Sequence, residues 1–247
     1  GHAGGGTKPL PSATFELLEE ALRVAVQSDG CFDPTLGVLM ERHGFRGAQE
    51  EGAGTGSWGS SAVQLDPQTR GVSLGAEGLR LDLGGIAKGR ALDLAAEVLR
   101  DHGVERALLH GGTSSVLGLG APAGLPGWRV ALSSDDGAPI AVLRDRALSV
   151  SASTGRASAA GGHIIDPHSG APCQLSAMAA VISTSASLAD AWSTALCVAG
   201  ERVLSLPSDC QALCQGPLQG EPWRPGGTLT DQFILPTQPA QGQALPA

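Results

Sequence analysis

Glycines and a lysine gather where the sequence changes from a strand pattern to a helix pattern. The stretch 81–90 holds Gly84, Gly85 and Gly89 together with Lys88. Glycines at such a junction let the backbone approach a ligand closely, and the free N–H groups of a first helical turn attract anions. Because the spacing matches neither the Walker loop nor the dinucleotide fingerprint, a phosphate-binding loop and a plain tight turn remain two interpretations of this stretch.

A carboxylate and two hydroxyls follow one another in a later helical pattern. Asp190 and Thr194 are four residues apart, which places them on one helix face, with Ser193 beside them. Hard oxygen ligands of this kind suit Mg²⁺, which takes few protein ligands and completes its shell with water and substrate phosphate. The alternative is structural, because Asp190 in a first helical turn would oppose the helix dipole while Thr194 packed its methyl group.

A histidine and a second carboxylate, His163 and Asp166, stand just before Pro167. Histidine can accept a proton near neutral pH, and either side chain could serve as a general base. Both also have plain structural roles, since a lone histidine is commonly satisfied by its neighbours and Asp-Pro commonly starts a turn. The segment Phe32-Asp33-Pro34 has the same structural alternative, a turn after a helix.

Patterns of apolar residues indicate the elements that must position these groups. Strand patterns occur at 71–74, 79–83, 106–110, 128–132, 140–143, 148–153 and 177–183. Helical patterns run from Ser12 or Thr14 to Asp29-Gly30, from Ala91 to Gly103 and from Ala189 to Ala199. The glycine stretch and its flanks therefore predict a strand–helix–strand unit, and the strand patterns from 128 onward predict an antiparallel meander. Residues 44–62, rich in glycine, are interpreted as a surface excursion.

The composition describes a globular protein that does not bind nucleic acid. Its 247 residues suffice for one sizeable core or two small lobes, and 42% of them are hydrophobic. The net charge of −8 contrasts with the basic face of nucleic-acid-binding proteins. No apolar run approaches the ~18 residues needed to span a bilayer. Five cysteines make no disulfide framework, and Cys210 and Cys214 have no further pair with which to build a zinc site.

Four blocks of this sequence resemble the ApbE family, the FAD:protein FMN transferases, in order and in approximate separation. The resemblance covers residues 12 to about 205 and rests on the combination, because no block is sufficient alone. The blocks are Gly30-Cys31-Phe32-Asp33-Pro34-Thr35-Leu36-Gly37, Asp82-Leu83-Gly84-Gly85-Ile86-Ala87-Lys88-Gly89, His163-Ile164-Ile165-Asp166-Pro167-His168-Ser169-Gly170 and Ala189-Asp190-Ala191-Trp192-Ser193-Thr194-Ala195-Leu196.

This resemblance implies a mixed α/β (α+β) fold of the ApbE type, with a strand–glycine loop–helix unit and antiparallel strands. We expect one such domain over residues 12–235, built as one body or two lobes, and flexible tails at 1–11 and 236–247. The implied activity is the Mg²⁺-dependent transfer of FMN from FAD to a Thr or Ser hydroxyl of a target protein, with release of AMP. The implied partners are FAD and a flavin-accepting protein, in the bacterial periplasm or cell envelope or in the cytoplasm.

The resemblance also assigns roles to residues by motif. The metal ligands would be the Ala87 carbonyl, Asp190, Ser193 and Thr194. The FAD-binding residues would be Cys31, Phe32, Asp33, Gly84, Gly85, Arg90 and the backbone at Ile164. His163 is the candidate proton acceptor for the incoming hydroxyl, with Asp166 as the alternative, and Lys88 would neutralise charge on the pyrophosphate.

Departures from the family pattern leave other functions open. Members usually begin with an N-terminal strand and helix that contribute to the flavin pocket, and this sequence starts after that region. Thr113 stands where many members have Asp, and His168-Ser169 replaces the more usual Arg-Thr. The alternatives are therefore an FAD-binding protein without transfer activity and an FAD pyrophosphatase that gives FMN and AMP.

Overall fold

The computed structural model describes residues 6–46, 56–135, 137–153, 157–158, 161–173, 178–200, 202, 204–216, 221–226 and 232–235. The α-helices of these residues are α1 (Ser12–Gln27), α2 (Gly37–Arg42), α3 (Ala87–Asp101) and α4 (Ala186–Ala199), and Ser60–Ala62 form a 3-10 turn, η1. None of these helices is long and apolar enough to cross a membrane.

A six-stranded antiparallel sheet forms the centre of the fold, in the order β13-β12-β11-β8-β5-β4. Its strands are β4 (Ala107–His110), β5 (Ser115–Leu119), β8 (Arg146–Ala152), β11 (Met178–Ser183), β12 (Gln211–Gln215) and β13 (Trp223–Pro225). The central pair runs from Met178 opposite Ala152 to Ser183 opposite Ala147. Both faces of this pair are covered, which explains why its residues are apolar or small.

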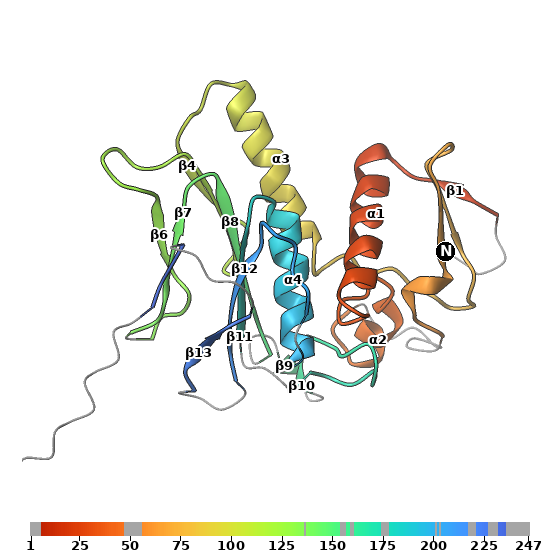
Figure 1. Cartoon of the computed structure of the whole chain (residues 1–247). Coiled ribbons are helices and arrows are strands. Elements are labelled where there is room, and N and C mark those ends of the chain that lie inside the picture. Colours follow the sequence, from red (N-terminus) through yellow and green to blue (C-terminus); the bar gives the residue numbers. More distant parts are fainter. Residues whose placement is uncertain are drawn as a thin grey trace, which may run out of the picture.

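Helices α3 and α4 lie against one face of the sheet, and a smaller sheet lies against the other (Figure 1). The smaller sheet has the order β14-β7-β6 and consists of β6 (Trp128–Ala131), β7 (Ile140–Leu143) and β14 (Phe233–Ile234). Buried side chains from both sheets, among them Leu143, Leu148 and Ile182, form the core between them. The layer order is therefore small sheet, large sheet and helices.

The helix α4 lies between the large sheet and α1, so it is buried on almost every side (Figure 1). Its alanines let both neighbours approach closely, and the fully buried Trp192 fills the remaining space. The Ser185 side chain caps the first turn by accepting a hydrogen bond from the N–H of Leu188, and Gly200, with φ at 61°, ends the helix. The helix begins at Ala186, earlier than the predicted Ala189.

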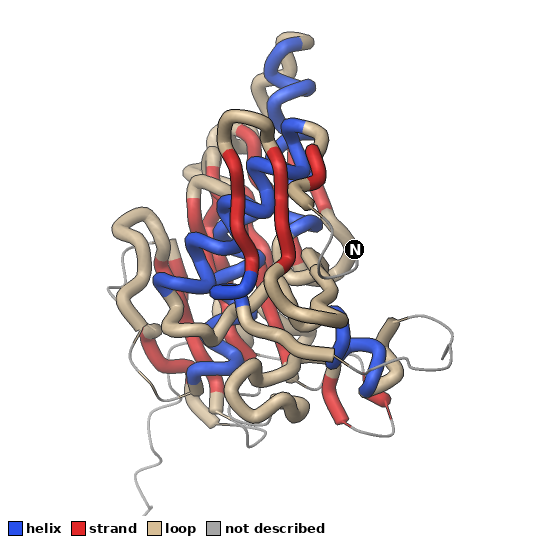
Figure 2. Tube along the Cα trace, turned by 90° about the vertical axis from the view of Figure 1, so that its right-hand side faces the viewer, coloured by secondary structure: helices blue, strands red, loops and turns tan. Residues whose placement is uncertain are grey.

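The outer side of α1 carries a third sheet, in the order β1-β3-β2, made of β1 (Lys8–Pro9), β2 (Val63–Asp66) and β3 (Gly71–Leu74). Figure 2 looks at the molecule from this side. Leu18 of α1 packs there with Val63, Val72 and Leu79 in a small separate core. A short pair of strands, β9 (Ala157–Ser158) and β10 (Gly161–Gly162), completes the strands of the described residues.

The predicted strand at 79–83 is wrong. Arg80 forms one isolated bridge with Leu36, and the N–H of Asp82 donates to the Pro34 carbonyl at 2.8 Å. Beyond α3, β4 pairs antiparallel with β5, so the predicted strand–helix–strand unit does not form. The apolar alternation at 79–83 arises because Leu79 is buried in the small core, not because the segment belongs to a sheet.

Other predictions from the apolar patterns are confirmed in whole or in part. Helix α1, strand β3 and strand β11 lie where they were predicted, and Gly103, with φ at 76°, follows the end of α3. The mixed fold with antiparallel sheets is also confirmed. The predicted meander is correct only for β6 and β7, because β8 crosses into the large sheet. Strand β5 was not predicted.

Two segments predicted to be exposed or flexible take part in the fold where the structure describes them. Lys8 and Pro9, within the predicted tail 1–11, pair with β3, whereas 1–5 and the predicted tail 236–247 lie outside the described residues. In the predicted surface excursion 44–62, Phe45 and Trp58 pack against the core formed by Val38, Leu39 and Ile165. Residues 47–55 lie outside the described part.

Candidate active site

A cavity of about 690 Å³ opens where the glycine loop, α4, the edge of the large sheet and the turn after α1 converge. This volume falls within the ~300–1,000 Å³ usual for small-molecule sites. Ten of the residues assigned from sequence line it: Cys31, Phe32, Asp33, Gly84, Gly85, Lys88, His163, Ile164, Asp190 and Thr194. The structure thus brings together groups that lie far apart in the chain.

Lys88 and Asp190 form an ion pair in the wall of this cavity. The Nζ of Lys88 lies 2.9 Å and 3.1 Å from the two carboxylate oxygens of Asp190, and 3.3 Å from the carbonyl of Gly84. The Asp190 side chain is 3% exposed and the Lys88 side chain 43%. The pair therefore joins a buried anion to a cation that can still reach a ligand in the cavity.

Hydroxyl groups surround the buried end of Asp190. Ser149 Oγ donates to Asp190 Oδ1 at 3.2 Å and lies 3.2 Å from Ser115 Oγ. Ser193 Oγ donates to the Asp190 carbonyl at 2.9 Å and lies 2.8 Å from Ser151 Oγ. These contacts hold the carboxylate in one orientation and supply the hydrogen bonds that a buried charge requires.

The interpretation of Asp190 as the helix-dipole partner of α4 does not fit the structure, because another residue has that position. Asp93 of α3 accepts hydrogen bonds from the N–H groups of Ala186, at 2.7 Å, and Ser187, at 3.0 Å. Asp190 is in the second turn, and its carboxylate faces Lys88 instead. The negative charge at the start of α4 thus comes from a neighbouring helix.

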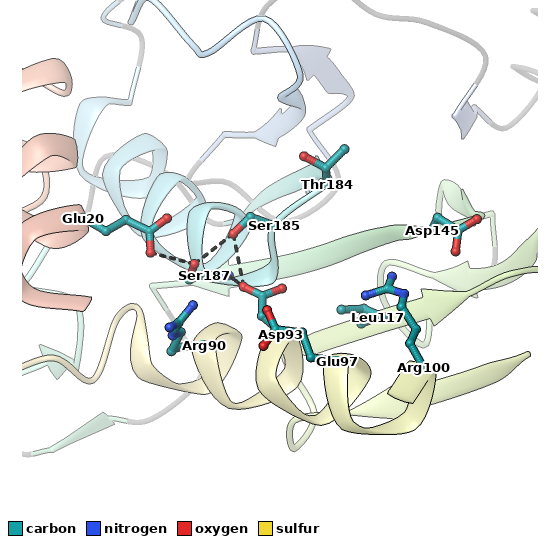
Figure 3. A pocket seen from close by; sticks show the side chains of 10 residues that line it. All are labelled: Glu20, Arg90, Asp93, Glu97, Arg100, Leu117, Asp145, Thr184, Ser185 and Ser187. Carbon is teal, nitrogen blue, oxygen red and sulfur yellow. Dashed lines mark hydrogen bonds between the residues drawn. The ribbon is translucent and has the colours of Figure 1, made fainter. Parts of the chain in front are cut away.

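Asp93 belongs to a second, smaller cavity of about 280 Å³ beside the first turn of α4 (Figure 3). Ser187 Oγ donates to Glu20 Oε2 at 2.8 Å, and Ser185 Oγ donates to Asp93 Oδ2 at 3.1 Å. The two serine hydroxyls are 2.8 Å apart. This chain of contacts joins α1, α3 and α4.

The glycine loop needs its glycines for close contacts rather than for positive φ. A Cβ at Gly84 would lie 2.6 Å from the guanidinium of Arg46 and 2.8 Å from Asp82 Oδ1, and one at Gly85 would lie 3.1 Å from the Phe32 ring. A Cβ at Gly89 would overlap the backbone carbonyl of Ala186. The loop therefore fits between the cavity and α4 only without side chains.

Asp82 and Arg46 brace the glycine loop from the cavity side. Two guanidinium nitrogens of Arg46 donate to the Asp82 carboxylate, both at 2.8 Å, and the N–H of Gly84 donates to Asp82 Oδ1 at 2.7 Å. The hydrogen bonds that Arg46 donates to Asp82, and then the negative charge of Asp82, raise the pKa of Arg46. Arg46 therefore places a permanent positive charge at the cavity rim.

The turn after α1 forms the opposite wall. Asp33 accepts from the backbone N–H and hydroxyl of Thr35 and from the N–H of Ser60, so its carboxylate fixes this turn. Burial raises the pKa of the Cys31 thiol, although the guanidinium of Arg202, 2.8 Å from Cys31 Sγ, acts in the opposite direction. Phe32 is 4% exposed and presents its ring to the glycine loop.

His163, Ile164 and Ile165 supply a third wall, at the start of a loop that turns back at Pro167. Ile165 forms an isolated bridge with Pro172, and the N–H of Cys173 donates to the Ile164 carbonyl at 2.7 Å. Asp166 belongs to the turn and does not line the cavity. Burial alone would raise its pKa, but hydrogen bonds from the N–H of His168 and from Ser169 Oγ hold the pKa below the ordinary value.

Three further assigned residues also lie outside the cavity lining. Arg90 is on the other side of α3, where its guanidinium lies 3.0 Å from Glu16 Oε2 and borders the smaller cavity. Ala87 begins α3, and Ser193 is fully buried behind Asp190. The geometry therefore gives Arg90 a role in joining α3 to α1 and gives Ser193 a role in supporting Asp190.

The sequence interpretation missed several residues of the cavity. They are chiefly Leu36, Met40, Phe45, Arg46, Asp82 and the segment 111–114. Arg46 and Phe45 lie at the start of the glycine-rich segment that was interpreted as a surface excursion. The pair Gly111-Gly112 directly after a strand was the available signal for the segment 111–114.

Comparisons with known proteins agree on one family. The model of the ApbE family matches residues 2–213 of this chain. A relative from Rhodobacter capsulatus described as FAD:protein FMN transferase is 32% identical over 217 residues, which are 81% of this chain and 41% of that protein. The protein of the same description from Escherichia coli strain K12 is 28% identical over 215 residues, 78% of this chain and 60% of that protein. This chain thus spans about half the length of these relatives.

Solved structures show the same fold. The crystal structure of the ApbE protein from Thermotoga maritima aligns with a TM-score of 0.77 at 27% identity, over 91% of this chain and 78% of that one. The flavinyl transferase ApbE from Pseudomonas stutzeri, in its apo form, aligns with a TM-score of 0.71 at 27% identity, over 91% of this chain and 74% of that one.

Proposed function

The chain belongs to the ApbE family, and from this premise we propose that it transfers FMN from FAD to a Thr or Ser hydroxyl of a target protein and releases AMP. The observation that carries the proposal is the meeting of the glycine loop, Lys88 and Asp190 in the wall of one cavity. Two relatives of this chain are described as FAD:protein FMN transferases.

The cavity has a charged end and an apolar side, as FAD requires. Lys88 and Arg46 face the space beside the glycine loop and would attract the pyrophosphate, whose charge must be neutralised for phosphoryl transfer. Leu36, Met40 and Phe45 line the same cavity and would contact the flavin ring. An open cavity of about 690 Å³ can hold the pyrophosphate and one of the two ring systems while the remainder stays at its mouth.

The oxygen donors in the wall fit a Mg²⁺ ion. Among the described residues, no group of three or more His, Cys, Asp and Glu side chains is placed to hold a metal. Mg²⁺ needs fewer, because it uses one or two carboxylates and completes its shell with water and phosphate. Asp190 and Thr194 both face the cavity and would hold the ion, and Lys88, which now neutralises Asp190, would turn to the substrate. Bound there, Mg²⁺ would supply positive charge to the pyrophosphate.

We assign the proton of the incoming hydroxyl to His163, because His163 lines the cavity and Asp166 does not. In the transfer step the acceptor oxygen forms a bond to the phosphorus of FMN, the bond from that phosphorus to the bridging oxygen of AMP breaks, and the hydroxyl proton passes to His163. Lys88 balances the charge that develops on the leaving phosphate.

The test is to incubate the protein with FAD, Mg²⁺ and a target that carries the family's acceptor motif. Flavin covalently attached to the target, measured by in-gel fluorescence and intact mass, is the expected result, with AMP formed in equal amount. Free FMN together with AMP would support the pyrophosphatase, in which water replaces the hydroxyl. Bound FAD that stays intact would support the passive binder.

A further inference from the structure

The imidazole of His168 joins two walls of the large cavity. One ring nitrogen, Nδ1, lies 3.2 Å from Asp166 Oδ1, on the same turn. The other, Nε2, lies 3.1 Å from the carbonyl of Asp29, at the end of α1. Asp29 begins the turn that continues into Cys31 and Phe32, while the His168 turn follows directly from His163 and Ile164. This one side chain therefore spans the junction between both walls.

Both partners of the ring can only accept hydrogen bonds. A carbonyl oxygen has no proton to give, and hydrogen bonds hold the pKa of Asp166 below its ordinary value, so that group is a carboxylate. A neutral imidazole carries one N–H and can satisfy one of the two acceptors, whereas the imidazolium satisfies both.

The rest of the turn is held independently of this junction. His43 Nε2 lies 2.9 Å from the Gly170 carbonyl, and Trp58 Nε1 donates to the Pro167 carbonyl at 2.9 Å. Asp29 and Gly30, at the corner after α1, have φ at 53° and 72°, and a Cβ on Gly30 would lie at an ordinary contact distance of 3.5 Å from the His168 ring. What His168 adds is the direct link between the two turns.

We infer that His168 is a positioning residue that, through its two ring nitrogens, fixes the wall carrying Phe32 relative to the wall carrying Ile164. This inference rests on the proposed function, because it assumes that FAD occupies the cavity between these walls. Loss of the link should let both turns move apart, so FAD should bind less tightly while the reacting groups at Lys88 and Asp190 remain intact. The effect should thus fall on KM more than on kcat.

Three variants at one position, and one beside it, separate this role from a general loss of stability. His168→Ala removes both donors, His168→Gln keeps one, and His168→Arg keeps two with a charge that does not titrate. Ser169→Ala is the matched control, because it removes a 3.0 Å hydrogen bond to the same Asp166 carboxylate without touching Asp29. Hydrogen–deuterium exchange without FAD, calorimetric titration with FAD, and KM and kcat for FAD in the transfer reaction provide the measurements.

For the Ala variant we expect faster exchange in both 29–32 and 164–170 and FAD binding about 3- to 10-fold weaker, the effect of losing a hydrogen bond. The Arg variant, which keeps two donors, should restore binding. The Ser169 control should leave 29–32 unchanged. Exchange that increases only in 164–170, or an Ala variant with wild-type KM, would overturn the inference. Wild-type protein that binds no FAD, with exchange in both segments rising as expected in the Ala variant, would instead overturn the proposed function alone.

Discussion

The ammonium of Lys88 lies 2.9 Å from the carboxylate of Asp190, although the two residues are 102 positions apart. Lys88 lies in the first turn of α3, and Asp190 lies in the second turn of α4. Since Asp93 already caps α4, the buried charge of Asp190 is not needed for the helix dipole. The Asp190 carboxylate therefore serves the cavity, where it pairs with Lys88, and not the stability of the helix.

The first prediction concerns this carboxylate. Asp190→Asn keeps shape while removing the charge that a hard divalent cation most needs, so the Mg²⁺ concentration for half-maximal turnover should rise more than about tenfold. The protein should stay folded, because Lys88 is exposed enough to turn to water. Asp93→Asn is the control and should lower stability by about 1 kcal/mol with no change in Mg²⁺ requirement. If turnover of the Asp190 variant depends on Mg²⁺ concentration as in the wild type, Asp190 is not a metal ligand.

Gly84→Val should weaken FAD binding in a protein that still folds. The new side chain would meet the guanidinium of Arg46 and Asp82 Oδ1, at 2.6 Å and 2.8 Å from its Cβ, and would push the loop or Arg46 out of place. We expect at least about a tenfold loss of affinity, since both the loop backbone and a cation would be displaced. Calorimetry with FAD measures this, and unchanged affinity would remove the loop from the site.

Gly89→Ala should behave differently, as a defect of folding. Its Cβ would overlap the backbone of Ala186, where α3 crosses α4, and backbone atoms cannot move aside as a side chain can. Overpacking of this kind should cost about 3 kcal/mol or more. Urea denaturation compared with Gly84→Ala provides the measurement, and equal midpoints for the two variants would contradict the packing argument.

Replacing the proposed base should separate binding from chemistry. His163→Ala should leave FAD bound while slowing transfer by about 10²–10⁴-fold, the range for loss of a general base. Single-turnover transfer at saturating FAD measures the step. If the variant turns over as fast as the wild type, His163 is not the general base and its role is structural.

Asp209 should make the protein sensitive to acid. Partial burial would raise its pKa, but hydrogen bonds from the hydroxyls of Ser183 and Thr184, both at 2.8 Å, and from the N–H of Thr184 lower it overall. A lowered pKa in the folded state means that this stabilisation is present above the unfolded pKa and is lost as the pH falls through the folded value. Asp209→Asn should therefore be less stable at neutral pH and lose less stability on acidification. Chemical denaturation at pH 7 and pH 3.5 tests this, and parallel pH profiles would contradict it.

Local patterns in the sequence predicted much of the fold. The amphipathic pattern of α1 and the glycine that ends α3 identified real elements because their signals lie within a few residues of one another. Strand β5 was missed because Ser115 and Gly118 interrupt its apolar run, although all of its residues are buried between layers. The prediction for the segment 79–83 failed for the converse reason, since its apolar residues are buried by α1 and the outer sheet while the segment forms one isolated bridge, from Arg80 to Leu36, and no strand.

The site could be predicted as a set of groups but not as a geometry. From spacing alone, Asp190 could be a metal ligand or the partner of the helix dipole. The second role is taken by Asp93, a residue of another helix, which the sequence could not show. Nor could spacing show that Arg90 faces Glu16 and not the cavity, because that depends on how α3 is rotated against α1. Arg46 was missed because it stands beside a glycine-rich segment that was interpreted as a surface excursion. Its partner Asp82 lies 36 positions away, so no local pattern links the two residues.

The crossing of α3 and α4 also determines how the cavity can open. Lys88 pairs with Asp190, Gly89 lets the two backbones touch, and Asp93 binds the start of α4, so contacts over the first two turns of α3 hold the helices together as one block. The end of the cavity beside the glycine loop belongs to that block. Under the proposed function, FAD would therefore enter by displacement of the opposite side of the cavity, the turns around Phe32 and Ile164.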